Sequence, residues 1–268
     1  IAVIAVIINH FNKNILPSGY LGVDIFFVIS GFVITSSLAK RQSNNFSDFI
    51  CGFFVRRIKR LVPPLVVFVL ITSLLISLFR IDSSGSLNTG ITSLFGLSNI
   101  ALFLKSKDYF AISTTLNPFT HTWSLGVEEQ FYFIYPFLIW FSGFGKKTLN
   151  SSKRLGVLLI LLAVCSSIFF IYQYSNNQPA AYYLMPSRFW EMSIGCLIFL
   201  GINGKYYIIQ KLNKISSFWV LSAIIGCMFL PITYGVLSTF LVVFLSAILI
   251  NSLSEGEMAF KILTNKTI

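Results

Sequence analysis

Charged residues are scarce in this chain. Only 11% of its 268 residues are charged, whereas 55% are hydrophobic and 28 are phenylalanine. A soluble domain of ordinary composition carries about 25% charged residues. The composition therefore excludes an ordinary soluble domain and predicts an integral membrane protein.

Cysteine and histidine are also scarce, with four and two residues respectively. The cysteines form no CxxC pair, and the two histidines, His10 and His121, lie far apart in the sequence. Neither a disulfide framework nor a spacing of metal ligands is present. We expect the cysteines to pack as small apolar residues, and we predict no metal site.

The net charge of +11 would suit a nucleic-acid-binding protein. The basic residues, however, gather in the regions 39–60, 142–154 and 202–215 and in the C-terminal tail, between apolar segments. The positive-inside rule places such regions on the cytoplasmic side of a membrane. We therefore predict the lipid bilayer as a partner, and no nucleic acid.

Continuous apolar runs predict an all-α, polytopic membrane helix bundle with about eight or nine membrane helices. A span needs about 20 mostly apolar residues. The candidate spans are residues 1–12, 20–38, 61–79, 122–141, 155–173, 184–201, 216–232 and 235–252. The more polar segment 88–104 is predicted to be re-entrant or interfacial, because only then do the basic regions fall on one side. Gly19, Gly22 and Gly31 would permit close helix contacts.

The segment HTWSLGVEEQFYFIYP, residues 121–136, places ionisable groups inside an apolar run. On a helix, His121, Ser124, Glu128 and Tyr132 share one stripe, and Glu129 points about 100° away. One glutamate can face a cavity while the other braces a neighbouring helix, and we assign Glu129 to the structural ion-pair residues.

Other ionisable residues occur within the predicted spans. They are His10, Asp24, Arg188 and Glu191. Arg188 and Glu191 are three positions apart on one predicted helix and can form a structural ion pair. If Asp24, Glu128, Glu129, Arg188 and Glu191 all faced lipid, the cost would be about 15 kcal/mol. We therefore expect them to converge on the interior of one bundle.

The basic run FFVRRIKRLVPP contains Arg56, Arg57 and Arg60. It has two interpretations: a positive-inside anchor whose side chains reach lipid phosphates, or a clamp for the phosphates of a ligand. Pro63 and Pro64 are expected to mark the start of the helix over 61–79.

Five blocks together resemble the integral-membrane acyltransferase-3 family of bacterial O-acyltransferases. They are IAVIAVIINH (1–10), GYLGVDIFFVISGFVIT (19–35), FFVRRIKRLVP (53–63), NPFTHTWSLGVEEQFYFIYP (117–136) and YYLMPSRFWEMSIGCL (182–197). The resemblance implies a fold of about ten helices in the full family, of which this chain would be one transmembrane domain, 1–268, truncated at both ends. It also implies a multi-pass protein of the bacterial inner membrane.

The family resemblance implies an O-acetyltransferase that moves an acyl group, by default acetyl, from cytoplasmic acyl-CoA to a hydroxyl of a surface glycan. The glycan would be O-antigen, capsule, exopolysaccharide or peptidoglycan, and acyl-CoA would be a substrate rather than a permanently bound cofactor. His10 matches the essential histidine of the first helix. Arg56, Arg57 and Arg60 match the RRxxRxxP signature that engages the donor.

His10 would act as a general base on the hydroxyl or would itself be transiently acylated. Asp24 or Glu128 would orient its imidazole. His121 would be a second catalytic group or a helix cap. A transporter or flippase with an intramembrane relay of His, Asp and Glu is the alternative function, although the sequence contains no internal repeat.

Overall fold

The computed structural model describes residues 1–41, 45–79, 84–106, 116–146, 150–204, 206–212 and 215–253. Within these residues there are helices, turns and bends, and no strand. The basic tail and parts of the basic regions 39–60, 142–154 and 202–215 lie outside the described residues.

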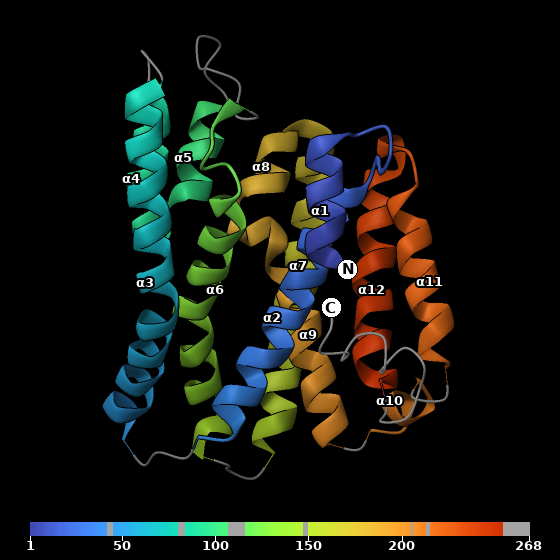
Figure 1. The fold of residues 1–268 in the computed structure, drawn as a ribbon. Coiled ribbons are helices and arrows are strands. Elements are labelled where there is room, and N and C mark those ends of the chain that lie inside the picture. Colours follow the sequence, from blue (N-terminus) through green and yellow to red (C-terminus); the bar gives the residue numbers. More distant parts are fainter. Residues whose placement is uncertain are drawn as a thin grey trace. The chain divides into compact units, whose positions relative to one another are not determined.

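The helices, shown in Figure 1, are α1 (Ala2–Phe11), α2 (Gly22–Ala39), α3 (Phe46–Phe79), α4 (Ser84–Leu94), α5 (Ser98–Lys105), α6 (Thr122–Phe141), α7 (Ser151–Asn176), α8 (Gln178–Tyr183), α9 (Met185–Asn203), α10 (Tyr207–Leu212), α11 (Ser217–Met228) and α12 (Gly235–Ser252).

Among the residues that the structure describes, four helical stretches are long and apolar enough to cross a membrane: Gly19–Ala39, Phe46–Phe79, Ser151–Asn176 and Ile232–Ser252. Ala2–Phe11 and Ser217–Met228 are shorter apolar helices. The predicted fold class, an all-α membrane helix bundle, is confirmed. The expected spans 122–141 and 184–201 do form helices α6 and α9. Because they contain polar, charged and aromatic residues, neither is among the four helices that are long and apolar enough to cross a membrane. The expected number of membrane crossings stays a prediction.

The chain divides into two compact units. Unit 1 comprises Ile1–Ser37, Gly156–Ala163 and Trp190–Ile268, and unit 2 comprises Leu38–Leu155 and Val164–Phe189. We describe each unit by itself. That residues 1–268 form a single domain stays a prediction.

In unit 1, α1 packs on the start of α2 through glycines. A side chain at Gly22 would meet the carbonyl oxygen of Ala2, and one at Gly19 would meet the carbonyl oxygen of Ala5. Asn9 donates from Nδ2 to the carbonyl of Leu16 at 2.7 Å, which ties the end of α1 to the following loop. Buried apolar side chains from α1, α2, α11 and α12 form the core next to this contact.

A close helix crossing of unit 1 joins α2 and α9. The space of a Cβ atom at Gly31 is filled by the carbonyl of Met192, and that at Gly195 by the carbonyl of Val28. Cys196 donates from Sγ to the Gly31 carbonyl at 3.4 Å. The prediction that Gly19, Gly22 and Gly31 permit close helix contact is confirmed.

In unit 2, α3 is one continuous helix of 34 residues. Pro63 and Pro64 lie inside it, so the prediction that they mark its start is wrong. Phe49 and Phe53 are buried one turn apart and extend the packed helix face upstream of the prolines. At 1.5 Å per residue α3 is about 51 Å long, well beyond a hydrocarbon layer of about 30 Å. Much of the expected loop 39–60 is therefore helix.

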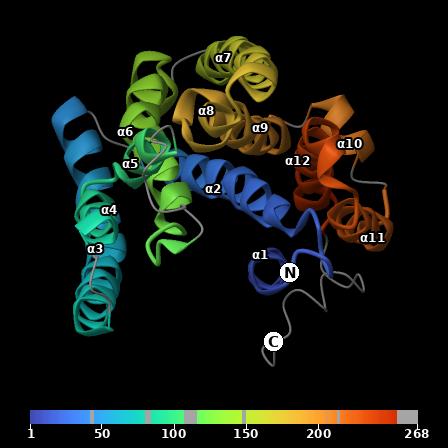
Figure 2. The same cartoon turned by 90° about the horizontal axis from the view of Figure 1, so that it is seen from above.

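Segment 88–104 does not form one helix. It is split between α4 and α5, which are joined at Phe95–Leu97 and lie side by side. Lys105, at the end of α5, donates to the carbonyl of Gly85, at the start of α4, and at 2.7 Å to Oγ1 of Thr89. The two ends of this hairpin therefore lie together, as the prediction of a re-entrant segment requires. Figure 2 shows α5 between α4 and α6.

Polar side chains hold the α4–α5 hairpin against α6. Oγ of Ser93 lies 2.7 Å from Oγ1 of Thr122, and Ser98 donates to the Thr122 carbonyl at 2.8 Å. Deeper along α6, Gln130 donates to the carbonyl of Gly96 at the hairpin tip. From Thr122 to Gln130 an α-helix rises about 12 Å. The tip therefore lies about two turns into the unit, beside the middle of α6.

Candidate functional site

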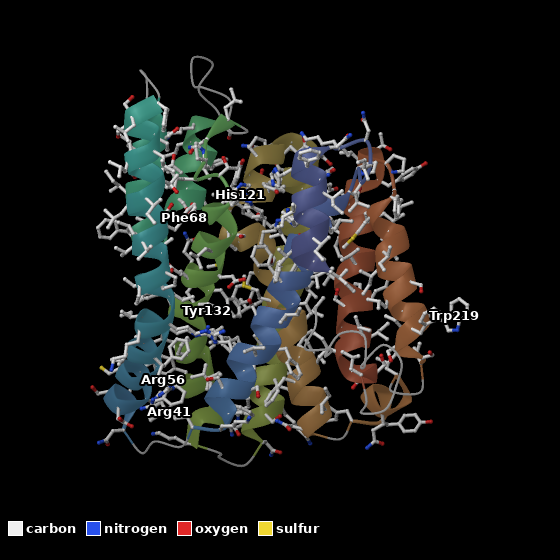
Figure 3. All side chains as sticks on the ribbon, viewed as in Figure 1. Arg41, Arg56, Phe68, His121, Tyr132 and Trp219 are labelled. Carbon is white, nitrogen blue, oxygen red and sulfur yellow. The ribbon has the colours of Figure 1, made fainter. Side chains whose placement is uncertain are left out.

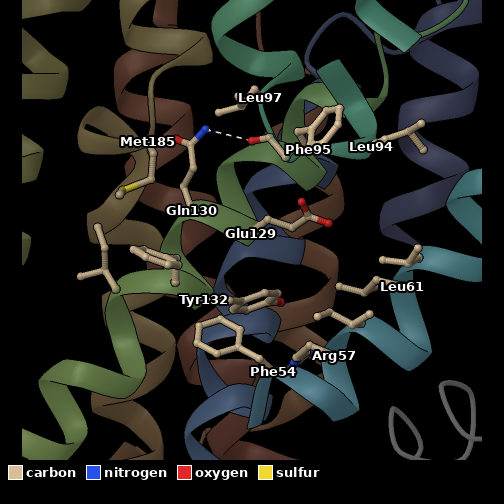
Figure 4. Close-up of a pocket in the computed structure, with 15 residues that line it drawn as sticks. Phe54, Arg57, Leu61, Leu94, Phe95, Leu97, Glu129, Gln130, Tyr132 and Met185 are labelled. Atoms are coloured by element: carbon tan, nitrogen blue, oxygen red, sulfur yellow. Dashed lines mark hydrogen bonds between the residues drawn. The ribbon is translucent and has the colours of Figure 1, made fainter. Parts of the chain in front are cut away.

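A partly open cavity of about 600 Å³ lies within unit 2, and several of its lining side chains, among them Phe95 and Phe133, are exposed. Its walls come from α3, the hairpin tip, α6 and Met185 (Figure 4). Most of the lining is aliphatic or aromatic; the polar side chains on it are those of Arg57, Glu129, Gln130 and Tyr132. Ligand sites typically have 300–1,000 Å³ and combine apolar walls with a few convergent polar groups. By size and composition this is the candidate binding site of unit 2.

Arg57 is the cationic residue of the cavity. Its guanidinium carbon lies 4.4 Å from the ring centroid of Tyr132 and 5.8 Å from that of Phe53. Aromatic rings attract a guanidinium through their quadrupole. Tyr132 in turn donates from its hydroxyl to Oε2 of Glu128 at 2.9 Å. Arg57 is thus held half-buried at the wall, with hydrogen-bonding nitrogens left for a ligand.

Glu129 is the acidic residue of the cavity, and it lies against the hairpin tip (Figure 4). Gly96 at the tip has a φ of 68°, a conformation that glycine adopts without strain. A Cβ atom at this position would also meet Oε2 of Glu129. Both the conformation and the space favour glycine at this position.

Gln130 fixes the hairpin tip. Its Nε2 donates to the Gly96 carbonyl at 3.1 Å and to Oδ1 of Asn99 at 2.8 Å, and Asn99 donates to the carbonyl of Tyr183 at 3.0 Å. The amide therefore links α6 to the hairpin tip and to α5 and, through Asn99, to α8. Sequence reasoning missed Gln130 and Gly96, because neither belongs to a periodic pattern; the only signal was the adjacency of Gln130 to the glutamate pair.

The structure separates the three arginines that were expected to engage a donor. Arg57 lines the cavity, whereas Arg56 and Arg60 are exposed on α3. The cause is helical geometry: positions 56 and 60 are one turn apart on one face, and position 57 points about 100° away. Arg56 and Arg41 lie at one end of unit 2 and His121 lies toward the other (Figure 3).

The two adjacent glutamates have different surroundings, as their helical offset predicted. Glu129, expected in a structural ion pair, lines the cavity and makes no ion pair with any residue that the structure describes. Glu128, expected at a catalytic position, accepts the Tyr132 hydrogen bond and is not part of the cavity wall. The carboxylate facing this cavity is thus that of Glu129, and the catalytic part assigned to Glu128 stays a prediction.

His121 and Arg188 occupy the remaining positions of interest in unit 2. His121 is exposed at the N-cap of α6, and its side chain makes no capping hydrogen bond. The Arg188 guanidinium lies 5.3 Å from the ring centroid of Tyr182, which packs on Trp123 with centroids 4.3 Å apart. Tyr182 thus contacts protein side chains on two sides. An ion pair of Arg188 with Glu191, three positions further on α9, stays a prediction.

His10, Asp24 and Glu191 belong to unit 1. His10 is exposed in the last turn of α1. Asp24 is 1% exposed in the first turn of α2, and Glu191 is 0% exposed on α9. The roles expected for His10 and Asp24 stay predictions. Among the described residues of both units, no three His, Cys, Asp or Glu side chains gather in an arrangement that could hold a metal ion.

Comparison with known proteins identifies the family. The model of the acyltransferase-3 family, described as "Acyltransferase domain", matches residues 1–263. The chain belongs to this family. The expectation drawn from the five sequence blocks is therefore confirmed, and the exposed His10, the divided arginine cluster and the α6 glutamates are features of a family member.

Several curated relatives are O-acetyltransferases by name. "Putative peptidoglycan O-acetyltransferase YrhL" of Bacillus subtilis is 35% identical over 203 residues, covering 74% of this chain and 31% of that protein. "O-acetyltransferase OatA" of Staphylococcus aureus is 32% identical over 199 residues, covering 74% of this chain and 32% of that protein. The chain thus spans about a third of the length of the relatives it matches. No solved structure matches it.

Proposed function

We propose that the protein lies in the bacterial inner membrane and transfers an acyl group, by default acetyl, from cytoplasmic acyl-CoA to a hydroxyl of a surface glycan. Family membership and the names of its relatives support this proposal. The name of the Bacillus subtilis relative favours peptidoglycan as the acceptor. O-antigen, capsule and exopolysaccharide are acceptors of the same chemistry.

The observation that carries the proposal is the cavity wall around Arg57. A half-buried guanidinium lines an apolar cavity, and the exposed Arg56 and Arg60 follow on the adjacent face of the same helix. Guanidinium groups bind phosphates through paired, charge-assisted hydrogen bonds. An acyl-CoA combines an anionic, phosphate-rich head with a slender arm and an acyl group. Its head would bind the arginines and its arm would enter the cavity.

The reaction replaces a thioester with an oxygen ester. The acceptor oxygen forms a bond to the acyl carbon, and the bond from that carbon to sulfur breaks. A base takes the proton of the hydroxyl and passes it to the departing CoA thiolate. His10 is the proposed base; in a two-step form its imidazole first accepts the acyl group and then passes it to the hydroxyl. Asp24 or Glu128 would orient the imidazole. Trapping an acylated protein after acid quenching separates the two forms.

The test uses purified full-length protein, labelled acetyl-CoA and a soluble glycan acceptor. The wild type should release CoA thiol and acetylate the acceptor, and His10→Ala should lose more than about a hundredfold of this rate. Because His10 is exposed, the variant should fold normally, which size-exclusion chromatography checks. Phe11→Ala, an exposed neighbour on α1, is the matched control and should keep the wild-type rate.

Two outcomes would contradict the proposal. A His10→Ala protein that acetylates the acceptor at the wild-type rate would remove His10 from the reaction. A folded wild-type protein that moves a glycan across a vesicle membrane without consuming acetyl-CoA would be a transporter.

A further inference from the structure

Glu129 is the one polar side chain of the cavity wall for which the described structure provides no partner. Gln130 binds the hairpin tip, Tyr132 binds Glu128, and Arg57 lies over the Tyr132 ring. The Glu129 carboxylate makes no hydrogen bond or ion pair within the part of the chain that the structure describes. A carboxylate among apolar walls is costly unless something compensates it.

A purely structural role for Glu129, as a cap of the hairpin tip, is excluded by the hydrogen bonds of the tip itself. The amide of Phe95 donates to the carbonyl of Thr92 at 3.2 Å, that of Gly96 to Ser93 at 3.2 Å, and that of Leu97 to Thr92 at 2.9 Å. The amide groups of the three tip residues are thus already used. The hairpin does not need Glu129 to satisfy its backbone.

The turn is nevertheless shaped around this carboxylate. Gly96 adopts a positive φ and leaves the space of its missing Cβ atom to Oε2 of Glu129. Gln130 then fixes the Gly96 carbonyl from the next position on α6. The tip and α6 together hold the Glu129 carboxylate at the cavity wall, where its oxygens can accept hydrogen bonds from a ligand.

The walls indicate the kind of ligand group that these oxygens bind. A metal ion would need several oxygen ligands, and among the described residues that line this wall Glu129 is the only carboxylate. A glycan, with hydroxyls in every direction, does not suit walls that are mostly aliphatic and aromatic. A slender, largely apolar chain with isolated N–H groups suits both the walls and the carboxylate.

We propose that Glu129 binds the pantetheine arm of the acyl donor by accepting a hydrogen bond from one of its amide N–H groups. This inference rests on the proposed function, since it assumes an acyl-CoA donor whose phosphates bind near Arg57. Glu129 is then a donor-binding residue that sets how far the arm enters the cavity. The opposite signs of Arg57 and Glu129 match the anionic head and the neutral, N–H-bearing arm.

The test compares two probes that differ only in the arm: acetyl-CoA, and 3′-phospho-ADP, which is the head without the arm. Both are titrated into purified full-length protein by calorimetry. Glu129→Leu should weaken acetyl-CoA binding by about 10- to 100-fold, since it removes a charge-assisted hydrogen bond, and should leave 3′-phospho-ADP binding within about twofold. Glu129→Gln keeps an uncharged acceptor oxygen and should weaken acetyl-CoA binding by about three- to tenfold. Ser124→Ala, on α6 but off the cavity wall, should bind both probes like the wild type.

The outcomes separate this inference from the proposed function. If Glu129→Leu and Glu129→Gln bind acetyl-CoA as tightly as the wild type does, the inference is wrong and the proposed function stands. Equal weakening of both probes would show general damage to the site and would also overturn the inference. If Glu129→Leu does not fold, Glu129→Gln decides alone. A wild-type protein that binds neither probe would contradict the proposed function itself.

Discussion

The crossing of α2 and α9 in unit 1 and the space between α3 and α6 in unit 2 represent opposite ways of packing membrane helices. At the crossing, backbone carbonyls occupy the places of the missing Cβ atoms of Gly31 and Gly195. Between α3 and α6, large side chains and the hairpin tip surround a cavity of about 600 Å³. One region leaves no space, and the other keeps enough space for a ligand.

The difference shows which residue types pack the helices and which form the binding site in a strongly hydrophobic chain. Small residues let two helices approach within backbone contact, where dispersion and weak hydrogen bonds hold them. Polar residues in unit 2 do two separate tasks: the network of Ser93, Asn99, Thr122 and Gln130 fixes the hairpin, whereas Arg57 and Glu129 face the cavity. Stability and binding are thus assigned to different side chains, even to adjacent ones on α6.

The largest expected effect comes from filling the tight crossing. Gly31→Leu places a branched side chain where the Met192 carbonyl lies. Because backbone rather than a flexible side chain must move, we expect a loss of more than about 3 kcal/mol, seen as little or no monodisperse full-length protein in detergent. Gly226→Ala, whose Cβ atom meets nothing within 4 Å, is the matched control and should fold at least as well as the wild type. Normal yield and thermal stability of Gly31→Leu would show that the crossing is not tight.

A smaller effect is expected at the hairpin tip. Gly96→Ala adds a methyl group at a φ of 68°, which costs about 1–2 kcal/mol, and the methyl group displaces the Glu129 carboxylate. The folded protein should therefore persist, with acetyl transfer lowered about 10- to 100-fold, as expected when a binding group is misplaced by about 1 Å. Gly85→Ala, in the same hairpin with only the Lys105 ammonium 3.8 Å away, should keep its activity. If Gly96→Ala and Gly85→Ala transfer acetyl groups at the same rate, the geometry of the hairpin tip does not affect the reaction.

Helix type and close packing could be predicted from the sequence because they follow from local pattern. Continuous apolar runs predicted the helices, and Gly31 predicted a close contact. That segment 88–104 turns back on itself is consistent with the expectation of a re-entrant or interfacial segment, which came from keeping the basic regions on one side; its place in the membrane stays a prediction. These features depend on composition and periodicity, both of which can be read from a single chain.

Features that depend on packing between distant segments could not be predicted. Pro63 and Pro64 were expected to start a helix, but the burial of Phe49 and Phe53 continues the helix upstream, with the Phe49 ring centroid 5.4 Å from that of Trp140. The helical offset separated Glu128 from Glu129 but could not tell which one faces a cavity, because that depends on where the hairpin tip lies. Gly96 and Gln130 acquire their importance only from this tip.

The central claim is that Arg57 binds the anionic head of an acyl donor at the cavity of unit 2. The most direct test is calorimetric titration of 3′-phospho-ADP into purified full-length Arg57→Ala and Lys59→Ala proteins; Lys59 is an exposed cation on the same helix. Because Arg57→Ala removes a charge-assisted contact, it should weaken 3′-phospho-ADP binding by more than about tenfold. Lys59→Ala should bind 3′-phospho-ADP within about twofold of the wild type. Equal affinity of the two variants would contradict the claim, because the basic run would then act only as a membrane anchor.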